Sequence, residues 1–218
     1  VGKDIKHCKM VVSGAGAAAL ACLDLVVDLG FPIENIIVTD LAGVVYKGRT
    51  ELMDPDKERF AQDIKERTLA EVIPGADIFL GLSAGGVLKQ DMVRQMAPKP
   101  LVLALANPTP EILPEEVRKV RDDVVMATGR SDYPNQINNV LAFPGIFRGA
   151  LDARASDINE PMKVAAAMAI ADCIKPDELS EEYIVPGIFN KEVTRRVARV
   201  VEAAAQESGV ARRRSKRV

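Results

Sequence analysis

The sequence of 218 residues lacks tryptophan and has one histidine, His7, and three cysteines. Cys8, Cys22 and Cys173 are widely spaced and odd in number, which argues against a disulfide scaffold or a zinc site. A Ser-His-Asp triad or a multi-histidine metal site would depend on a single residue near the N-terminus. We therefore expect neither of these sites in this chain.

The sequence also lacks an excess charge of either sign and any long apolar run. There are 29 Lys and Arg against 31 Asp and Glu, a net charge of −2, so nothing attracts nucleic acid or acidic membranes to the chain as a whole. The one basic cluster, in residues 212–218, has no aromatic residue on which a base could stack. No apolar run approaches the roughly 18 residues of a membrane span, and the N-terminus does not resemble a signal peptide. We expect a cytoplasmic protein without nucleic-acid or membrane partners, and a disordered basic tail.

Short apolar segments alternate with helical patterns along the first 130 residues. We expect strands at 9–13, 35–40, 77–81, 101–105 and 124–128. Helical patterns lie between them at 20–29, 58–73 and 89–96. This alternation predicts an α/β fold with a Rossmann-like, doubly wound parallel sheet. After Asp132 the strand pattern fades, and we expect additional C-terminal helices at 135–153, 159–174 and 190–208.

A glycine-rich turn, Gly14-Ala-Gly-Ala-Ala-Ala19, joins the first expected strand to the first expected helix. In a dinucleotide-binding turn the first glycine permits the sharp bend and the second lets a pyrophosphate approach the backbone. Alanine is an accepted variant at the third position, here Ala19. The start of the helix presents unpaired N–H groups to the diphosphate. The alternative is a glycine-rich turn that binds no ligand.

Asp40 ends the second expected strand, 21 residues after Ala19. This spacing suits an acidic residue that holds the 2′-hydroxyl of an adenosine ribose, and it strengthens the prediction of dinucleotide binding. Asp40 alone favours NAD over NADP, because a carboxylate repels a 2′-phosphate. Lys47 and Arg49 lie close enough in sequence to weaken that preference, so the choice between NAD and NADP stays open.

Four longer segments resemble one protein family. They are Val12-Ser-Gly-Ala-Gly-Ala-Ala18, Gly43-Val-Val-Tyr-Lys-Gly-Arg49, Leu103-Ala-Leu-Ala-Asn-Pro-Thr-Pro110 and the stretch from Ala127 to Ala150. The chain resembles the cofactor-binding domain of a bacterial malic enzyme from about Val1 to Arg213. We accordingly expect residues 1–211 to form the NAD(P)-binding domain.

The resemblance implies oxidative decarboxylation of L-malate to pyruvate and CO2, with reduction of NAD or NADP and a Mg or Mn ion in the complete enzyme. It places the cofactor phosphates over the turn and brings Asp40, Ser83 and Asn107 to the cofactor. The turn residues are Gly14, Ala15, Gly16, Ala17 and Ala18. Asn107, Asn138 and Asn139 are expected to bind substrate, because an amide donates to a carboxylate without adding charge. Without the family, Asn107 would be taken for a turn residue, and Asn138 and Asn139 for a helix cap or surface pair.

In that family the tyrosine acid, the lysine base and the acidic metal ligands precede the glycine-rich turn, whereas this chain starts 13 residues before Gly14. We therefore expect no catalytic residue and no metal ligand in this chain. An N-terminal malic domain would be the missing partner, and the chain alone would bind dinucleotide without turning malate over. The complete protein is expected to be a homo-oligomer. Some bacterial members of that family carry a further domain after this region that resembles a phosphate acetyltransferase.

Two other hypotheses fit part of the sequence. A non-catalytic, dinucleotide-binding regulatory module would also lack the acid, the base and the metal ligands. Another Rossmann-type dehydrogenase would need a catalytic Asp or Lys after the turn, and Asp132 and Lys163 are more simply a loop residue and a charge on a helix face.

Overall fold

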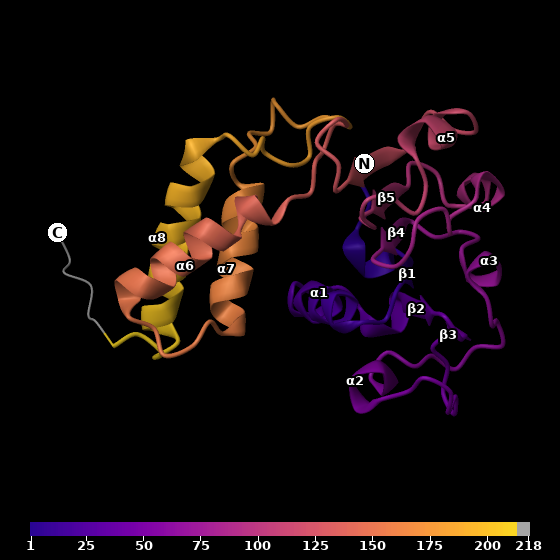
Figure 1. The fold of residues 1–218 in the computed structure, drawn as a ribbon, viewed down its shortest axis with the longest axis horizontal. Helices are drawn as coiled ribbons and strands as arrows, with labels where there is room; N and C mark the ends of the chain where they lie inside the picture. Colours follow the sequence, from indigo (N-terminus) through magenta and orange to yellow (C-terminus); the bar gives the residue numbers. More distant parts are fainter. Residues whose placement is uncertain (213–218) are drawn as a thin grey trace. The chain divides into compact units, whose positions relative to one another are not determined.

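The computed structural model describes residues 1–212, so the expected disorder of the tail falls outside the described residues except at Arg212. The chain divides into two compact units, Val1–Pro134 and Asn135–Val218 (Figure 1). The strand pattern of the sequence fades at Asp132, two residues before this division. The assignment of residues 1–211 to one domain stays a prediction.

A six-stranded sheet in the order β3-β2-β1-β4-β5-β6 forms the centre of the first unit. Its strands are β1 (Met10–Ser13), β2 (Ile36–Asp40), β3 (Gly43–Val44), β4 (Ile78–Gly81), β5 (Leu101–Ala104) and β6 (Val125–Thr128). The five expected strands are confirmed to within one residue at each end, and all of them pair in parallel. The short β3 is a correction, because it pairs antiparallel with β2 and makes the sheet mostly rather than wholly parallel. Two residues are too few to show a period in the sequence.

Helices cover both faces of this sheet. They are α1 (Ala17–Asp28), α2 (Pro55–Glu58), α3 (Leu69–Val72), α4 (Gln90–Arg94) and α5 (Pro114–Arg118). Met10 and Val12 of β1 pack in one apolar cluster with residues of α1, whereas Val11 packs in a second cluster with residues of α3, α4 and α5. Burial on both faces explains why the parallel strands are almost continuously apolar. The arrangement confirms the expected Rossmann-like fold.

The prediction of one helix over 58–73 is wrong, because only the two ends of this range are helical, in α2 and α3. Between them the backbone pairs with the edge of the sheet. Gln62 donates its N–H to the carbonyl of Val45 at 3.2 Å, and Val44 donates to the carbonyl of Arg67 at 2.9 Å. These long-range hydrogen bonds replace the helical ones, and the local sequence pattern could not predict them.

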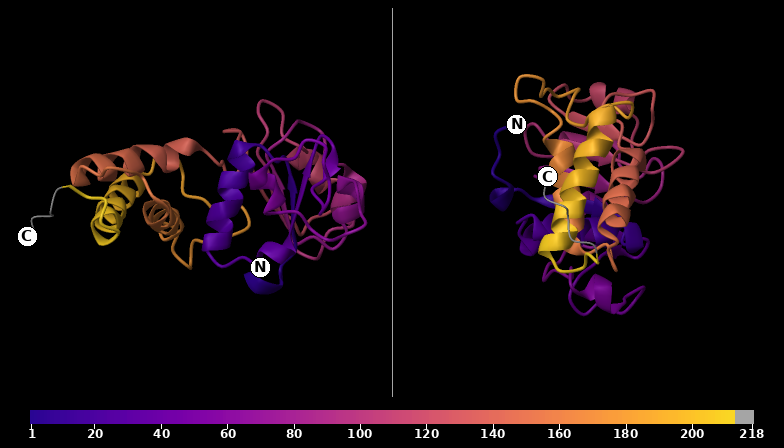
Figure 2. Two further views of the ribbon diagram at one scale, coloured as in Figure 1. Left: turned by 90° about the horizontal axis from the view of Figure 1, so that it is seen from below. Right: turned by 90° about the vertical axis from the view of Figure 1, so that its left-hand side faces the viewer.

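In the second unit three helices pack around one apolar cluster. They are α6 (Phe143–Ala153), α7 (Glu160–Ala171) and α8 (Lys191–Glu207), preceded by a short 3-10 segment, η3 (Asn139–Leu141) (Figure 2). Gly149 of α6 lets α8 approach, because a Cβ there would lie 2.4 Å from the carbonyl oxygen of Ala198. The additional C-terminal helices are thus confirmed, although the helix expected at 135–153 begins only at Phe143. The side chain of Asn135 instead bonds to the backbone of Glu181 and Ile184.

Within residues 1–212 the helices are all too short or too polar to cross a membrane.

Candidate functional site

The carboxyl ends of β1 and β4 lie side by side where the strand order reverses. The chain moves from β1 to β2 on one side of this point and returns to β4 on the other. Ligands of open α/β sheets bind at such a switch point. A pocket of about 430 Å³ lies there, lined by Ser13, Gly14, Ala15, Gly16, Asp40, Leu41, Leu52, Lys57, Ser83, Ala84 and Val87.

Gly14 begins the turn that forms the floor of this pocket. Its φ of +112° lies in the region that favours glycine, and a Cβ would lie 2.3 Å from the carbonyl oxygen of Leu82. Its N–H donates to the carbonyl of Thr39 at 2.8 Å. The turn is therefore held between the ends of β2 and β4, and no other residue type fits there without a shift.

Gly16 precedes α1 and leaves open space beside the start of this helix. A Cβ at Gly16 would have no atom within 4 Å, and the first helical hydrogen bond runs from the N–H of Leu20 to the carbonyl of Gly16. The N–H groups of Ala17 and Ala18 therefore precede the first helical bond, and no side chain in the described part of the chain caps the helix. Free donors at a helix N-terminus bind anions. This cradle fits the diphosphate of a dinucleotide.

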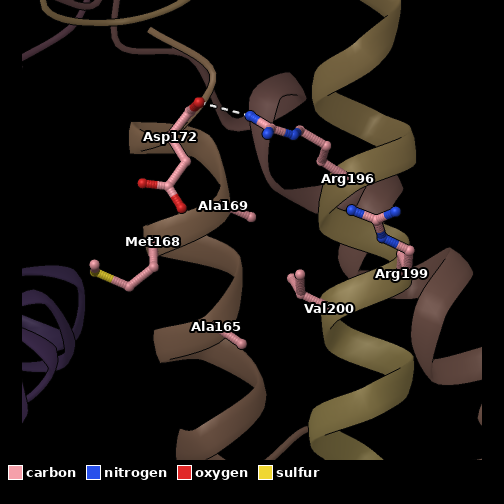
Figure 3. Close-up of a pocket in the computed structure, with 7 residues that line it drawn as sticks. All are labelled: Ala165, Met168, Ala169, Asp172, Arg196, Arg199 and Val200. Atoms are coloured by element: carbon pink, nitrogen blue, oxygen red, sulfur yellow. Dashed lines mark hydrogen bonds between the residues drawn. The ribbon is translucent and has the colours of Figure 1, made fainter. Parts of the chain in front are cut away.

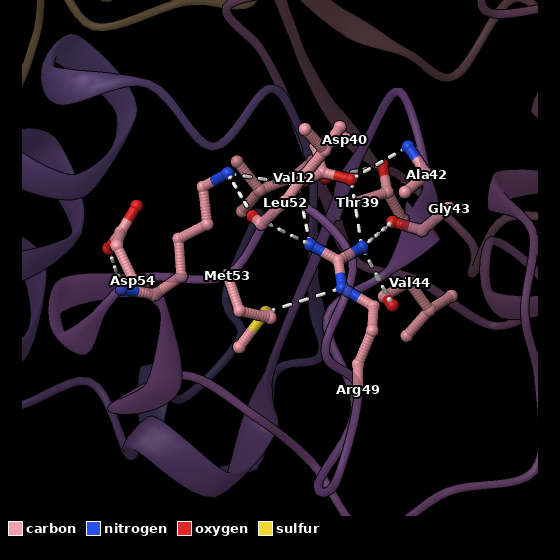
Figure 4. A network of polar contacts seen from close by, with 11 residues as sticks. Val12, Thr39, Asp40, Ala42, Gly43, Val44, Arg49, Leu52, Met53 and Asp54 are labelled. Carbon is pink, nitrogen blue, oxygen red and sulfur yellow. Dashed lines mark hydrogen bonds and ion pairs between the residues drawn. The ribbon is translucent and has the colours of Figure 1, made fainter.

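Asp40 lines the pocket at the end of β2 and is surrounded by donors (Figure 4). Arg49 donates to both carboxylate oxygens, at 2.8 and 2.6 Å. The N–H of Ala42 donates at 2.9 Å and the ammonium group of Lys57 at 3.2 Å. Burial alone raises the pKa of the Asp40 carboxyl, but these hydrogen bonds outweigh it and hold the pKa below its ordinary value.

The donors around Asp40 bear on the predicted choice of cofactor. A carboxylate has about four acceptor positions, and Arg49 fills two, Ala42 one and Lys57 one. A ribose hydroxyl would have to replace one of these donors. Two cations also outweigh the one negative charge of Asp40, so the argument from Asp40 for NAD over NADP loses its basis.

Ser83 lies across the pocket from Asp40, at the end of β4. Its hydroxyl is 2.8 Å from the hydroxyl of Ser13 at the end of β1. Asn107 follows β5 and does not line the pocket, and its amide reaches the carbonyl of Leu105 at 3.5 Å. The structure thus brings Gly14, Ala15, Gly16, Asp40 and Ser83 together. The cofactor and substrate roles given to Asn107 stay predictions.

Asn138 and Asn139 belong to the second unit. The side chain of Asn138 accepts the N–H of Val140 at 3.0 Å and caps η3. This is the helix-cap role that the sequence predicts for Asn138 without the family. Asn139 is the first residue of η3 and is exposed. Their substrate roles also stay predictions. Asp132 pairs with Arg130 and Lys163 with Glu160, both in exposed positions.

A second pocket, of about 270 Å³, lies between α7 and α8 (Figure 3). Arg196 of α8 donates to the backbone carbonyl of Asp172 at 2.6 Å, where α7 ends. A cation is favourable at the carboxyl end of a helix, so this contact stabilises α7. The pocket has neither a glycine turn nor a helix N-terminus, and it does not resemble a nucleotide cradle.

The sequence patterns did not identify Lys57 or the apolar pocket residues Leu41 and Leu52. Lys57 follows Asp40 by 17 residues, and only the irregular path after β3 brings its ammonium group back to the carboxylate. Leu41 is 99% exposed although it is apolar, which a local pattern cannot predict. In residues 1–212 no group of three or more His, Cys, Asp or Glu side chains is placed to hold a metal ion.

Comparison with known proteins agrees with this geometry. Residues 1–206 match the family model described as malic enzyme, NAD binding domain. The chain is 51% identical to an NADP-dependent malic enzyme and 54% identical to an NAD-dependent malic enzyme, both of Rhizobium meliloti. Each alignment covers 97% of this chain but only 30% and 29% of the relative. The solved malic enzyme of Entamoeba histolytica superposes with a TM-score of 0.91 and 35% identity, over 98% of this chain and 46% of that one.

Proposed function

Because this chain belongs to the malic enzyme family as its NAD-binding domain, we propose that it holds a nicotinamide dinucleotide in the pocket where β1 and β4 end. One observation carries this proposal. The open space beside Gly16, the unpaired N–H groups of α1 and the cationic wall at Lys57 all border one cavity. Each of these features suits a phosphate-bearing ligand.

Different residues of the chain bind different parts of the dinucleotide. The N–H groups at the start of α1 hold the diphosphate, and Gly14 and Gly16 keep side chains out of its path. Asp40 holds Lys57 and Arg49 at the ribose end, and Ser83 lines the pocket after β4. Bound there, the dinucleotide supplies the acceptor for a hydride. Relatives of similar identity are named for NAD and for NADP, so both are candidates.

The chain spans about 30% of the length of the two curated relatives and about half of the solved one. We propose that the whole protein converts L-malate to pyruvate and CO2, works in the cytoplasm and forms a homo-oligomer. We also propose that it uses a Mg or Mn ion. The residues described by the structure provide no cluster for such an ion, so we assign no metal-dependent step to them. Asn107, Asn138 and Asn139 would bind the substrate side.

The test is calorimetric titration of the 218-residue chain with NAD and NADP, beside an assay of malate oxidation with and without Mn. We expect binding of at least one dinucleotide and no turnover by the chain alone. Binding of neither would contradict the proposed cofactor site. Turnover by the chain alone would show that the acid and base lie within it, contrary to the proposal. A whole protein that binds dinucleotide but never oxidises malate would favour the regulatory module.

A further inference from the structure

Glu111 is a fully buried carboxylate that the proposed function does not use. It lies in the loop between β5 and α5 and does not line the dinucleotide pocket. None of the cations in residues 1–212 pairs with it, although an unpaired charge is costly to bury. Its environment must therefore compensate for that cost through hydrogen bonds.

Three donors surround this carboxylate. Oε1 accepts the N–H of Ser83 at 2.9 Å and the hydroxyl of Ser83 at 3.3 Å, and Oε2 accepts the N–H of Ala106 at 3.0 Å. All three of these groups can donate a hydrogen, which matches an acceptor-only carboxylate. Hydrogen bonds to an ionised acceptor are stronger than neutral ones. One side chain thus ties the segment after β4 to the segment after β5.

The sheet makes room for this side chain. A Cβ on Gly81, the last residue of β4, would lie 2.4 Å from Cδ of Glu111 and 2.6 and 2.7 Å from its two oxygens. The carboxylate therefore occupies the space that a side chain at Gly81 would fill. No residue larger than glycine is compatible with this placement of Glu111 unless the carboxylate moves.

The polar contacts of Glu111 continue through Ser83 to the residues that line the pocket. The hydroxyl oxygen of Ser83 lies 3.3 Å from Oε1 of Glu111. The same hydroxyl lies 2.8 Å from the hydroxyl of Ser13, and either serine could be the donor in this contact. Leu82, just before Ser83, donates its N–H to the carbonyl of Ser13 at 2.8 Å and contacts Gly14 through its own carbonyl. Because Ser83 follows Leu82 directly, the position of Ser83 influences the position of the glycine turn.

We propose that Glu111 is a positioning residue of the dinucleotide pocket. Its carboxylate holds the backbone and hydroxyl of Ser83 and the backbone of Ala106 before the dinucleotide arrives, and it does not touch the dinucleotide itself. The inference rests on the proposed function, because the pocket it organises is the proposed cofactor site.

The first test replaces Glu111→Gln in the 218-residue chain and measures the Kd for NAD and NADP by calorimetry. The amide keeps the size of the side chain but turns an NH2 group toward one of the two backbone N–H donors. We expect the Kd to rise at least about tenfold, which corresponds to about 1.4 kcal/mol. Glu116→Gln, a change of the same type in nearby α5, should leave the Kd unchanged. Equal Kd values for wild type and Glu111→Gln would overturn the proposal.

A double-mutant cycle with Ser83→Ala separates positioning from general loss of stability. If Glu111 acts through Ser83, Glu111→Gln should raise the Kd less in the Ser83→Ala background than in the wild type. If the two substitutions act independently, the factors by which they raise the Kd should multiply in the double variant. That result would contradict the proposal that Glu111 acts through Ser83.

Hydrogen exchange on the unmodified chain keeps the proposal testable even if Glu111→Gln does not fold. The N–H groups of Ser83 and Ala106 should be protected from exchange before any dinucleotide is added. Rapid exchange of both would show that Glu111 does not hold them in advance. A wild-type chain that binds neither NAD nor NADP would refute the proposed function, while these amide measurements would still decide whether Glu111 orders the two segments.

Discussion

Arg49 forms two hydrogen bonds with the carboxylate of Asp40, 2.8 and 2.6 Å long, in a pair whose side chains are only 3% and 9% exposed. Removing one partner of a buried ion pair leaves an uncompensated charge behind. The pair joins the end of β2 to the segment after β3, so it supports both the fold and the ribose end of the pocket.

We predict that Asp40→Asn lowers the free energy of unfolding by about 3 kcal/mol at pH 7, because Arg49 stays buried without its charge partner. Urea unfolding of the two proteins measures the difference. Asp63→Asn, which changes an exposed carboxylate of the same unit, should cost less than about 0.5 kcal/mol. A similar small cost for Asp40→Asn would show that the pair contributes little to stability.

The same pair makes this stability difference depend on pH. Because the folded protein lowers the pKa of Asp40, its contribution is complete above the ordinary aspartate pKa of about 3.9 and disappears as the pH falls through the lower folded value. The gap between wild type and Asp40→Asn should therefore be widest near neutral pH and narrow below about pH 4. A gap that stayed constant into strong acid would contradict this assignment.

Lys57 is the cation of the pocket wall, and we predict that it favours NADP. Lys57→Ala should raise the Kd for NADP about tenfold, because a charge-assisted contact to the 2′-phosphate is lost. The Kd for NAD should change less, since the substitution also frees an acceptor position on Asp40 for a ribose hydroxyl. Parallel titrations with the two dinucleotides measure the ratio.

Lys47→Ala is the matched control for Lys57, since Lys47 is exposed and does not line the pocket. It removes the same charge and should leave both Kd values unchanged. If the two variants weaken NADP binding equally, the effect comes from net charge and the role given to Lys57 is wrong.

Gly14 and Gly16 should respond differently to the same added methyl group. Gly14→Ala should lower the free energy of unfolding by about 2 kcal/mol or more, because its φ is positive and Cβ would overlap the carbonyl of Leu82. Gly16→Ala meets no atom and should fold normally, yet weaken dinucleotide binding because the methyl group extends into the cradle. Chemical denaturation and calorimetry on both variants separate the two effects. Equal stability losses would contradict the assignment of Gly14 to the turn and Gly16 to the ligand.

Local sequence patterns predicted the parallel strands, the end of the first helix and the glycine turn, because these features depend on residues that are close together in the sequence. The five parallel strands follow from short apolar runs that are buried on both faces of the sheet. The first helix, expected to end at residue 29, is followed by Gly30, which has a φ of +97° and donates its N–H to the carbonyl of Val27, as a glycine at a helix end commonly does. The turn at Gly14 and the position of Asp40 at the end of β2 were likewise evident from residue type and spacing.

Long-range contacts decided the rest. The stretch from 59 to 68 is not helical because its backbone pairs with the edge of the sheet, and that edge is formed by a strand too short to leave a pattern. The role of Asp40 at the ribose stays a prediction, and its spacing from the turn could not show that the chain beyond β3 brings two cations onto its carboxylate. The sequence patterns did not predict a role for Glu111, because a single glutamate forms neither a period nor a motif. Residue type and spacing therefore specified the strands and the glycine turn, whereas tertiary structure decided which charges meet, since charge pairing depends on distances in space.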